Sequence, residues 1–167
     1  IEGWVTKDYG RIWKLDDPRA AGSSLRRQTQ ELLAAGFDAR PVRELAALLG
    51  HADQRVRRKA QFALAGRNAA GGEALHTAAR EAGQQLARIH GLWGLWQLAR
   101  QNEQYAGKMV SFLEDKDPEM RAQAAKVLGD IRYRPAGQAL IPLLQDGAPR
   151  VRFFAAEALG RLAYGPA

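Results

Sequence analysis

The sequence contains no cysteine, and this absence excludes disulfide bonds, thiolate nucleophiles, iron–sulfur clusters and thiolate-ligated zinc. It also contains no apolar run near the length of about eighteen residues that a membrane-spanning helix needs, so we expect no membrane insertion by this segment. The chain begins with Ile1 and has no charged region followed by an apolar stretch. We therefore expect it to start inside a longer polypeptide.

Groups that commonly carry catalysis are scarce. Serine occurs three times, never within a Gly-x-Ser-x-Gly motif, so a serine hydrolase has no support. The histidines His51, His76 and His90 are separated by 25 and 14 residues, which does not match the spacing of paired metal ligands on one helix. We expect no catalytic residue, cofactor site or metal site in this segment.

Residues that favour strands are also few. Valine, isoleucine and threonine together occur only 14 times, against 31 alanines and 20 leucines. Alanine and leucine lose little side-chain freedom in helices, whereas β-branched residues lose more. The composition therefore predicts an all-α fold.

Positive charge exceeds negative charge, with 25 Lys and Arg against 18 Asp and Glu and a net charge of +7. The basic residues are spread evenly, 14 in residues 1–83 and 11 in residues 84–167. The densest cluster is Arg55, Arg57, Arg58 and Lys59, whose side chains point in several directions around one expected helix. A nucleic-acid footprint needs basic side chains on one face, so we expect no specific nucleic-acid partner.

An internal repeat is the strongest pattern in the chain. The segment Val56-Arg57-x-x-Ala60-x-x-Ala63-Leu64 recurs from Met120 and from Val151, and in a more divergent form from Ala87. The recurring arginines are Arg57, Arg88, Arg121 and Arg152, separated by 31, 33 and 31 residues. We expect these arginines to span the stack and to bind acidic side chains or carbonyls of neighbouring turns. A ladder that binds a ligand is the alternative.

A shorter apolar stretch with helical spacing precedes each copy, so the repeating unit is a pair of helices. We expect a repeat domain over 24–163 with units near 41–67, 71–100, 105–133 and 136–163, and a leading helix before them. Residues 17–23 are expected to form a linker. Because no single pair can bury its own apolar face, stacking of the pairs must supply one continuous core.

The best copy, from Asp115 to Gly129, resembles HEAT repeats, especially the short bacterial kind also found in phycobilin lyase subunits. The resemblance covers residues 41–163. It implies a right-handed HEAT-like α-α superhelix of about four helical pairs plus a leading helix. It says almost nothing about activity.

Residues 1–16 do not follow the repeat, and their alternation of apolar and polar residues predicts an extended arm or the last strand of a missing domain. Tyr9-Gly10-Arg11-Ile12-Trp13-Lys14-Leu15 is similar to a strand of the PVC-type membrane-bound dehydrogenases of bacteria, in which a β-propeller related to sorbosone dehydrogenases continues into HEAT repeats. That resemblance implies a periplasmic or other extracytoplasmic location, with any dehydrogenase chemistry outside these residues. The chain lacks the Cys-x-x-Cys-His motif of the haem domain that often ends such proteins.

Two functions remain open at this level. The first is a non-catalytic scaffold that docks another protein chain or a missing domain of the same polypeptide. The second is a basic HEAT-like module that binds nucleic acid, as in the alkylpurine DNA glycosylases with helical repeats. Those enzymes need aromatic and acidic residues together on the concave face; Trp93 and Trp96 supply aromatics, but no acidic residue is clearly placed beside them. We therefore favour the scaffold.

The repeat register also predicts where a docking surface lies. In each second helix, the face opposite the core should line the concave side of the array. The candidate docking residues are Arg58, Phe62, Ile89, Trp93, Trp96 and Phe153. If they are exposed together they form an interaction patch; the alternative is that the aromatic side chains pack against an adjacent helix.

Overall fold

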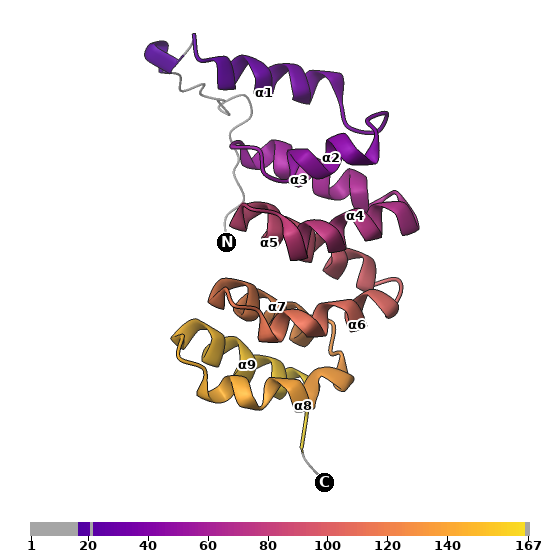
Figure 1. The fold of residues 1–167 in the computed structure, drawn as a ribbon, viewed down its shortest axis with the longest axis vertical. Helices are drawn as coiled ribbons and strands as arrows, with labels where there is room; N and C mark the ends of the chain where they lie inside the picture. Colours follow the sequence, from indigo (N-terminus) through magenta and orange to yellow (C-terminus); the bar gives the residue numbers. More distant parts are fainter. Residues whose placement is uncertain (1–16, 21, 166–167) are drawn as a thin grey trace, which may run out of the picture.

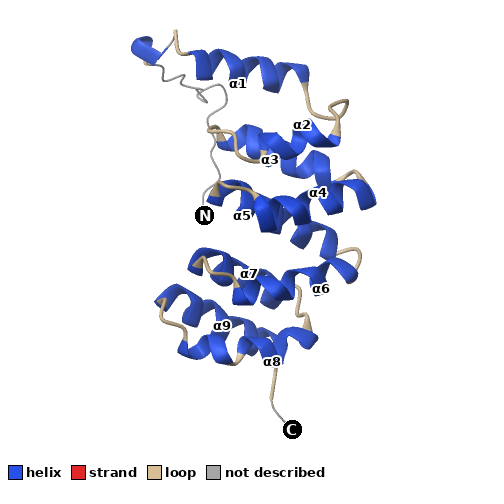
Figure 2. Ribbon diagram, viewed as in Figure 1, coloured by secondary structure: helices blue, strands red, loops and turns tan. Residues whose placement is uncertain are grey.

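The computed structural model describes residues 17–20 and 22–165, and every regular element within them is helical (Figures 1 and 2). The predicted arm at 1–16 lies outside the described residues. A short 3-10 turn, Pro18–Ala20, precedes α1 (Ser24–Ala35).

Four helical pairs follow α1 and stack along the long axis of the molecule (Figure 1). The pairs are α2 (Val42–Leu48) with α3 (Gln54–Ala65), α4 (Asn68–Glu81) with α5 (Gln85–Ala99), α6 (Gln104–Val110) with α7 (Pro118–Asp130), and α8 (Gly137–Leu140) with α9 (Pro149–Leu162). First helices lie along one side of the stack and second helices along the other. The prediction of an all-α array of helical pairs is confirmed.

The first helices of the last two pairs contain 3-10 turns. α6 continues into Ser111–Glu114, while α8 lies between Arg134–Ala136 and Pro142–Gln145. Pro142 lacks a backbone N–H and cannot extend the α-helical hydrogen bonding, which is consistent with the short α8. No described helix is long and apolar enough to cross a membrane.

Side-chain capping fixes the start of two second helices. The carboxylate of Asp53 accepts a hydrogen bond from the backbone N–H of Arg55 at 2.8 Å, and that of Asp117 accepts one from Glu119 at 2.9 Å. Pro118 occupies the first turn of α7, where a missing N–H costs no helical hydrogen bond. Both aspartates therefore cap the helices that they precede.

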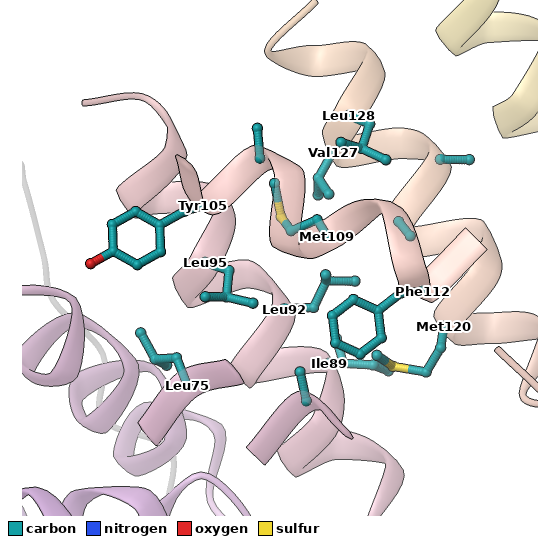
Figure 3. Close-up of a cluster of buried hydrophobic side chains, with 14 of the residues drawn as sticks. Leu75, Ile89, Leu92, Leu95, Tyr105, Met109, Phe112, Met120, Val127 and Leu128 are labelled. Carbon is teal, nitrogen blue, oxygen red and sulfur yellow. The ribbon is translucent and has the colours of Figure 1, made fainter. Parts of the chain in front are cut away.

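One continuous core runs through the stack. Figure 3 shows the part where α4, α5, α6 and α7 meet, with Leu92 and Leu95 facing Met109 and Val127. Leu64, Leu95 and Leu128, at the same repeat position, are fully buried. The fourth equivalent, Leu159 in the last pair, is only partly buried.

Two glycines permit helices to approach closely. A Cβ atom on Gly91 would lie 2.6 Å from the carbonyl oxygen of Leu75, so α5 can approach α4 only with glycine there. A Cβ atom on Gly129 would lie 2.7 Å from the Cα of Ala158, which joins α7 to α9 in the next pair. Small residues thus set the spacing both within a pair and between pairs.

Candidate docking groove

A groove with a volume of about 440 Å³ runs across α3, α5, α7 and α9. We call it the docking groove. Its lining combines aromatic and charged side chains over a polar floor: Phe62, Trp93, Trp96, Phe154, Arg58, Lys126, Asp130, Arg150, Gln54, Gln61, His90, Gln123 and Val127. All four second helices contribute to it.

The aromatic side chains in the groove are accessible. Phe62 is 49% exposed, and Trp93 and Trp96 are partly buried. Phe154 is also partly buried, and the Arg150 guanidinium lies 5.1 Å from the centre of its ring. These rings therefore present apolar area to solvent inside a concave surface, where a ligand could bury it.

A buried polar network forms part of the groove floor. Arg57 donates from Nε to Nε2 of His90 at 3.2 Å, so His90 carries its proton on Nδ1 and donates it to Oε1 of Gln61 at 2.8 Å. The His90 ring also meets Trp93 edge to face, with ring centres 5.1 Å apart. His90 links α5 to α3 and orients one of the groove's aromatic rings.

The network keeps His90 neutral. Burial, together with the positive charge of Arg57, lowers the pKa of His90 from 6.5 to about 4. Protonation would replace the hydrogen bond that Nε2 accepts with a repulsive contact to the guanidinium. His90 is therefore a structural group and is not charged near neutral pH.

A second chain of polar groups crosses to α7 and α9. Trp93 donates from its indole nitrogen to Gln123 at 2.9 Å, and Gln123 donates to Glu119 at 2.7 Å. Arg150 completes the chain with an Nε–carboxylate contact of 3.1 Å to Glu119. The orientation of Trp93 is thus fixed by the hydrogen bond that it donates to the neighbouring pair.

The charged lining of the groove is positive in sum. Lys126 pairs with Asp130 at 2.8 Å, and Arg161 pairs with the other oxygen of the same carboxylate. Arg58 is exposed and forms no ion pair with any described residue. With Arg150 included, three cationic side chains and one carboxylate line the groove, which favours an anionic or acidic ligand.

The structure places Arg88 and Arg121 between successive pairs. Arg121 binds both carboxylate oxygens of Asp146 at 2.8 and 2.9 Å and also donates to the carbonyl of Asp115 at 2.7 Å. Arg88 binds the Asp115 carboxylate and the carbonyl of Ala79. The hydrogen bond from Arg121 lowers the pKa of Asp146. For Asp115, burial opposes ionisation, but hydrogen bonds from Arg88 and the backbone leave its pKa lowered overall.

The outer members of the series have different partners. Arg57 binds the carbonyls of His51 and Ala52 in its own turn and His90 in the next pair. The turn ahead of it carries Ala82 at the position of Asp115 and Asp146, so no carboxylate is offered to Arg57 there. Arg152, in the last pair, binds only carbonyl oxygens of its own turn among the described residues.

Two of the predicted docking residues do not belong to the groove as expected. Ile89 is 7% exposed and packs in the core, whereas Phe153 is 64% exposed and does not line the groove. Ile89, Ala122 and Phe153 share one repeat position with Arg58, which is exposed and lines the groove. Ile89 and Ala122 are covered by the next pair along the stack, and Phe153 belongs to the last pair.

Sequence reasoning missed Phe154 and Asp130. Phe154 lies one residue beyond the predicted row and turns into the groove. Asp130 lies four residues after Lys126, on the same face of α7, and this spacing is the signal that could have found it. It supplies the acidic residue near Trp93 and Trp96 that the sequence alone did not place.

The part of the chain that the structure describes contains no group of three or more His, Cys, Asp or Glu side chains that could hold a metal ion.

Comparisons with known proteins agree with this geometry. The family model for HEAT repeats matches residues 108–167. A structure of human deoxyhypusine hydroxylase in complex with glycerol is similar over 77% of this chain and 45% of that chain, with a TM-score of 0.59 and 25% identity. The described chain has a HEAT-like repeat fold.

The crystal structure of an engineered protein is similar to the HEAT-like array over 75% of this chain and 63% of that chain, with a TM-score of 0.50 and 22% identity. At this identity the likeness concerns the fold alone. No curated protein matches the sequence. The array spans less than half of the hydroxylase chain, so the activity in that protein's name does not pass to this one by similarity.

Proposed function

We propose that this chain is a non-catalytic helical-repeat scaffold whose docking groove takes a segment of another protein. The observation that carries the proposal is the set of accessible aromatic rings, Phe62, Trp93 and Trp96, gathered in one concave surface. Aromatic side chains in concave surfaces commonly supply most of the free energy of protein association.

The charge of the groove indicates the kind of segment. Arg58 has no ion pair with a described residue and Arg150 is exposed, while the only lining carboxylate among the described residues, Asp130, is already paired. We infer a segment with one large apolar side chain that packs on the aromatic rings and acidic side chains on either side of it. Complementary charge of this kind sets orientation and speeds encounter.

Fluorescence anisotropy tests the proposal with a matched pair of labelled peptides. Both carry a central phenylalanine; one has glutamates on either side and the other has lysines at the same positions. We expect the acidic peptide to bind at least tenfold more tightly, because only it complements Arg58 and Arg150.

Variants then locate the binding. Phe62→Ala and Arg58→Glu should each weaken binding of the acidic peptide about tenfold or more. Arg43→Glu is the matched control. Arg43 is an exposed arginine on α2, in the layer of first helices, and it does not line the docking groove. Equal binding of both peptides, or equal loss with Arg43→Glu, would refute this site.

One observation favours a second function, binding of nucleic acid. Asp130 lines the same positive groove as Trp93 and Trp96, which is the combination that the sequence had not placed together. Both oxygens of Asp130 are held by cations, Lys126 and Arg161, which argues against a free carboxylate for catalysis. The scaffold therefore remains our proposal, and duplex DNA is a competing ligand to be measured.

We also propose, from the motif at residues 9–15, that this segment belongs to a larger dehydrogenase-like protein with an extracytoplasmic location. Its HEAT-like array would then dock a domain of the same polypeptide or a partner chain. The coding sequence upstream of Ile1 tests this. A β-propeller of the sorbosone dehydrogenase type is expected there, and any other domain would refute the proposal.

A further inference from the structure

The outer face of α9 repeats the surface by which α7 receives its neighbour. On α7, the row Ala122, Ala125 and Gly129 is buried. The positions 31 residues later on α9 are Phe153, Ala156 and Gly160, and all three are exposed. We call this second row the α9 face.

On α7, the glycine of the row lies where α9 of the next pair approaches closely. A Cβ atom on Gly129 would lie 2.7 Å from the Cα of Ala158, so only glycine lets the backbone of α9 approach α7. A Cβ atom on Gly160 would meet no atom within 4 Å. Glycine inside a helix is less favourable than alanine, and at Gly160 no contact with a described residue requires it.

The arginine of the last pair, Arg152, also lacks the partner that its equivalent Arg121 has in the next pair. Arg121 reaches forward to the carboxylate of Asp146 in the turn of the next pair. Arg152 holds the equivalent position, and its hydrogen bonds to described residues go from Nη1 alone to the carbonyls of its own turn, at Asp146 and Gly147. Its other nitrogens have no hydrogen-bond partner among the described residues.

The way α9 ends also matches the way α7 ends. After α7, Arg132 takes a left-handed conformation with φ of 54°. The backbone N–H of Tyr133 donates back to the carbonyl of Leu128 at 3.0 Å. After α9, Ala163 has φ of 47°, and the backbone N–H of Tyr164 donates to the carbonyl of Leu159 at 3.2 Å. The sequence continues in parallel, with Tyr-Arg-Pro-Ala from Tyr133 and Tyr-Gly-Pro-Ala from Tyr164. The first of these leads directly into α8.

We propose that the α9 face is a stacking interface for a fifth helical pair, joined in line after Ala167. That pair would place a small residue of its second helix over Gly160 and an acidic residue of its turn against Arg152. Phe153 fits this arrangement, because Ile89 holds the same row position on α5 and is buried. Repeat arrays end on a polar outer face when they are capped, and this face is apolar.

An extended chain tests the proposal, made by appending a second copy of residues 137–167 to the 167-residue protein. The copy carries its own equivalents of Ala158 and Asp146 at the required spacing. We expect the urea midpoint of the extended chain to exceed that of the original chain, because repeat arrays gain stability from each new interface.

Two substitutions show whether the gain comes from the α9 face. Gly160→Gln should remove the gain in the extended chain, yet leave the 167-residue chain unchanged or slightly more stable. Arg152→Ala should lower the midpoint of the extended chain more than that of the original. An unchanged midpoint on extension, or a gain that survives Gly160→Gln, would overturn the proposal.

Sedimentation of the 167-residue chain tests whether a second copy of the chain, and not an in-line pair, covers the α9 face. We expect a monomer at micromolar concentrations. A dimer that dissociates with Gly160→Gln would mean that a second copy covers the face, and it would overturn the in-line pair.

Discussion

At the scale of single residues, buried polar groups hold the groove in shape. Gln61, His90 and Gln123 are each at most 5% exposed, and each has a hydrogen-bond partner in the network. Burial of a polar group is costly unless such a bond is formed. The aromatic rings above them are therefore oriented by groups that a hydrophobic pattern does not reveal.

His90 makes stability depend on pH. Its pKa falls from 6.5 to about 4 in the folded chain, so between these values the unfolded chain takes up a proton that the folded chain does not. Stability is therefore full above about pH 6.5 and decreases as the pH falls towards about 4. Between about pH 7.5 and about pH 5 this one group should cost about 2 kcal/mol.

The matched variant is His90→Gln, which cannot titrate. Urea unfolding of both proteins at the two pH values isolates the contribution of His90 from that of other groups. The wild type should lose more stability than the variant over this interval. Equal losses would show that His90 is already protonated in the fold or accessible to solvent.

The position of a leucine in the stack should determine its contribution to stability. Leu128 is fully buried between pairs, whereas its equivalent Leu159 is partly buried in the last pair. We expect Leu128→Ala to lower the free energy of unfolding by about 2 to 5 kcal/mol and Leu159→Ala to lower it by less. Urea midpoints of the two variants check this order, and the reverse order would contradict the stacking of pairs.

At the scale of elements, the second helices were the most predictable. Their small residues, leucines and arginines recur at fixed offsets because each occupies the same place in the stack. The first helices were less predictable, because their apolar stretches are shorter. The split of the last ones into α-helical and 3-10 pieces depends on local features such as Pro142.

Arginines of one helical pair bind the turn of the next pair. The ion pair between Arg121 on α7 and Asp146 in the turn before α9 is the clearest example. Their side chains are 19% and 8% exposed, and two hydrogen bonds join them. In a double-mutant cycle with alanine we expect a coupling free energy of about 1 to 3 kcal/mol.

Arg152 provides the control for this cycle, since it contacts the same turn only through carbonyl oxygens. The cycle of Arg152→Ala with Asp146→Ala should give a coupling smaller than that of Arg121. Comparable coupling in both cycles would mean that Asp146 acts through the charge of its surroundings and not through the bond to Arg121.

At the scale of the whole molecule, the sequence predicted the groove's aromatic rings but not its complete lining. Phe62, Trp93 and Trp96 follow from the repeat register. Asp130 is indicated only by its spacing of four residues from Lys126. Phe154 does not follow from the register, because its direction depends on how far α9 is rotated against α7. That rotation is set by the close approach at Gly129, which is a tertiary contact. Ile89 was misplaced because the register alone cannot tell whether a position of one row is covered by the next pair, as Ile89 is, or open to the groove, as Arg58 is.

The distribution of charge over the molecule limits its affinity for duplex DNA. Many of its basic side chains, such as Arg88, Arg121 and Arg161, are already bound to carboxylates. The groove cations Arg58, Lys126 and Arg150 lie together on one concave surface, but the last two have acidic partners. We expect micromolar or weaker binding near physiological salt, with a slope of log affinity against log salt no steeper than about −3, since each neutralised phosphate contributes about −0.9.

Titration of a labelled duplex at several salt concentrations measures both quantities. Arg58→Glu should weaken this binding no more than Arg43→Glu does, because dispersed charge has no preferred residue. Nanomolar binding with a steep salt dependence, lost with Arg58→Glu and kept with Arg43→Glu, would assign the groove to nucleic acid. The acidic peptide would then compete for the same cations and should be displaced by the duplex.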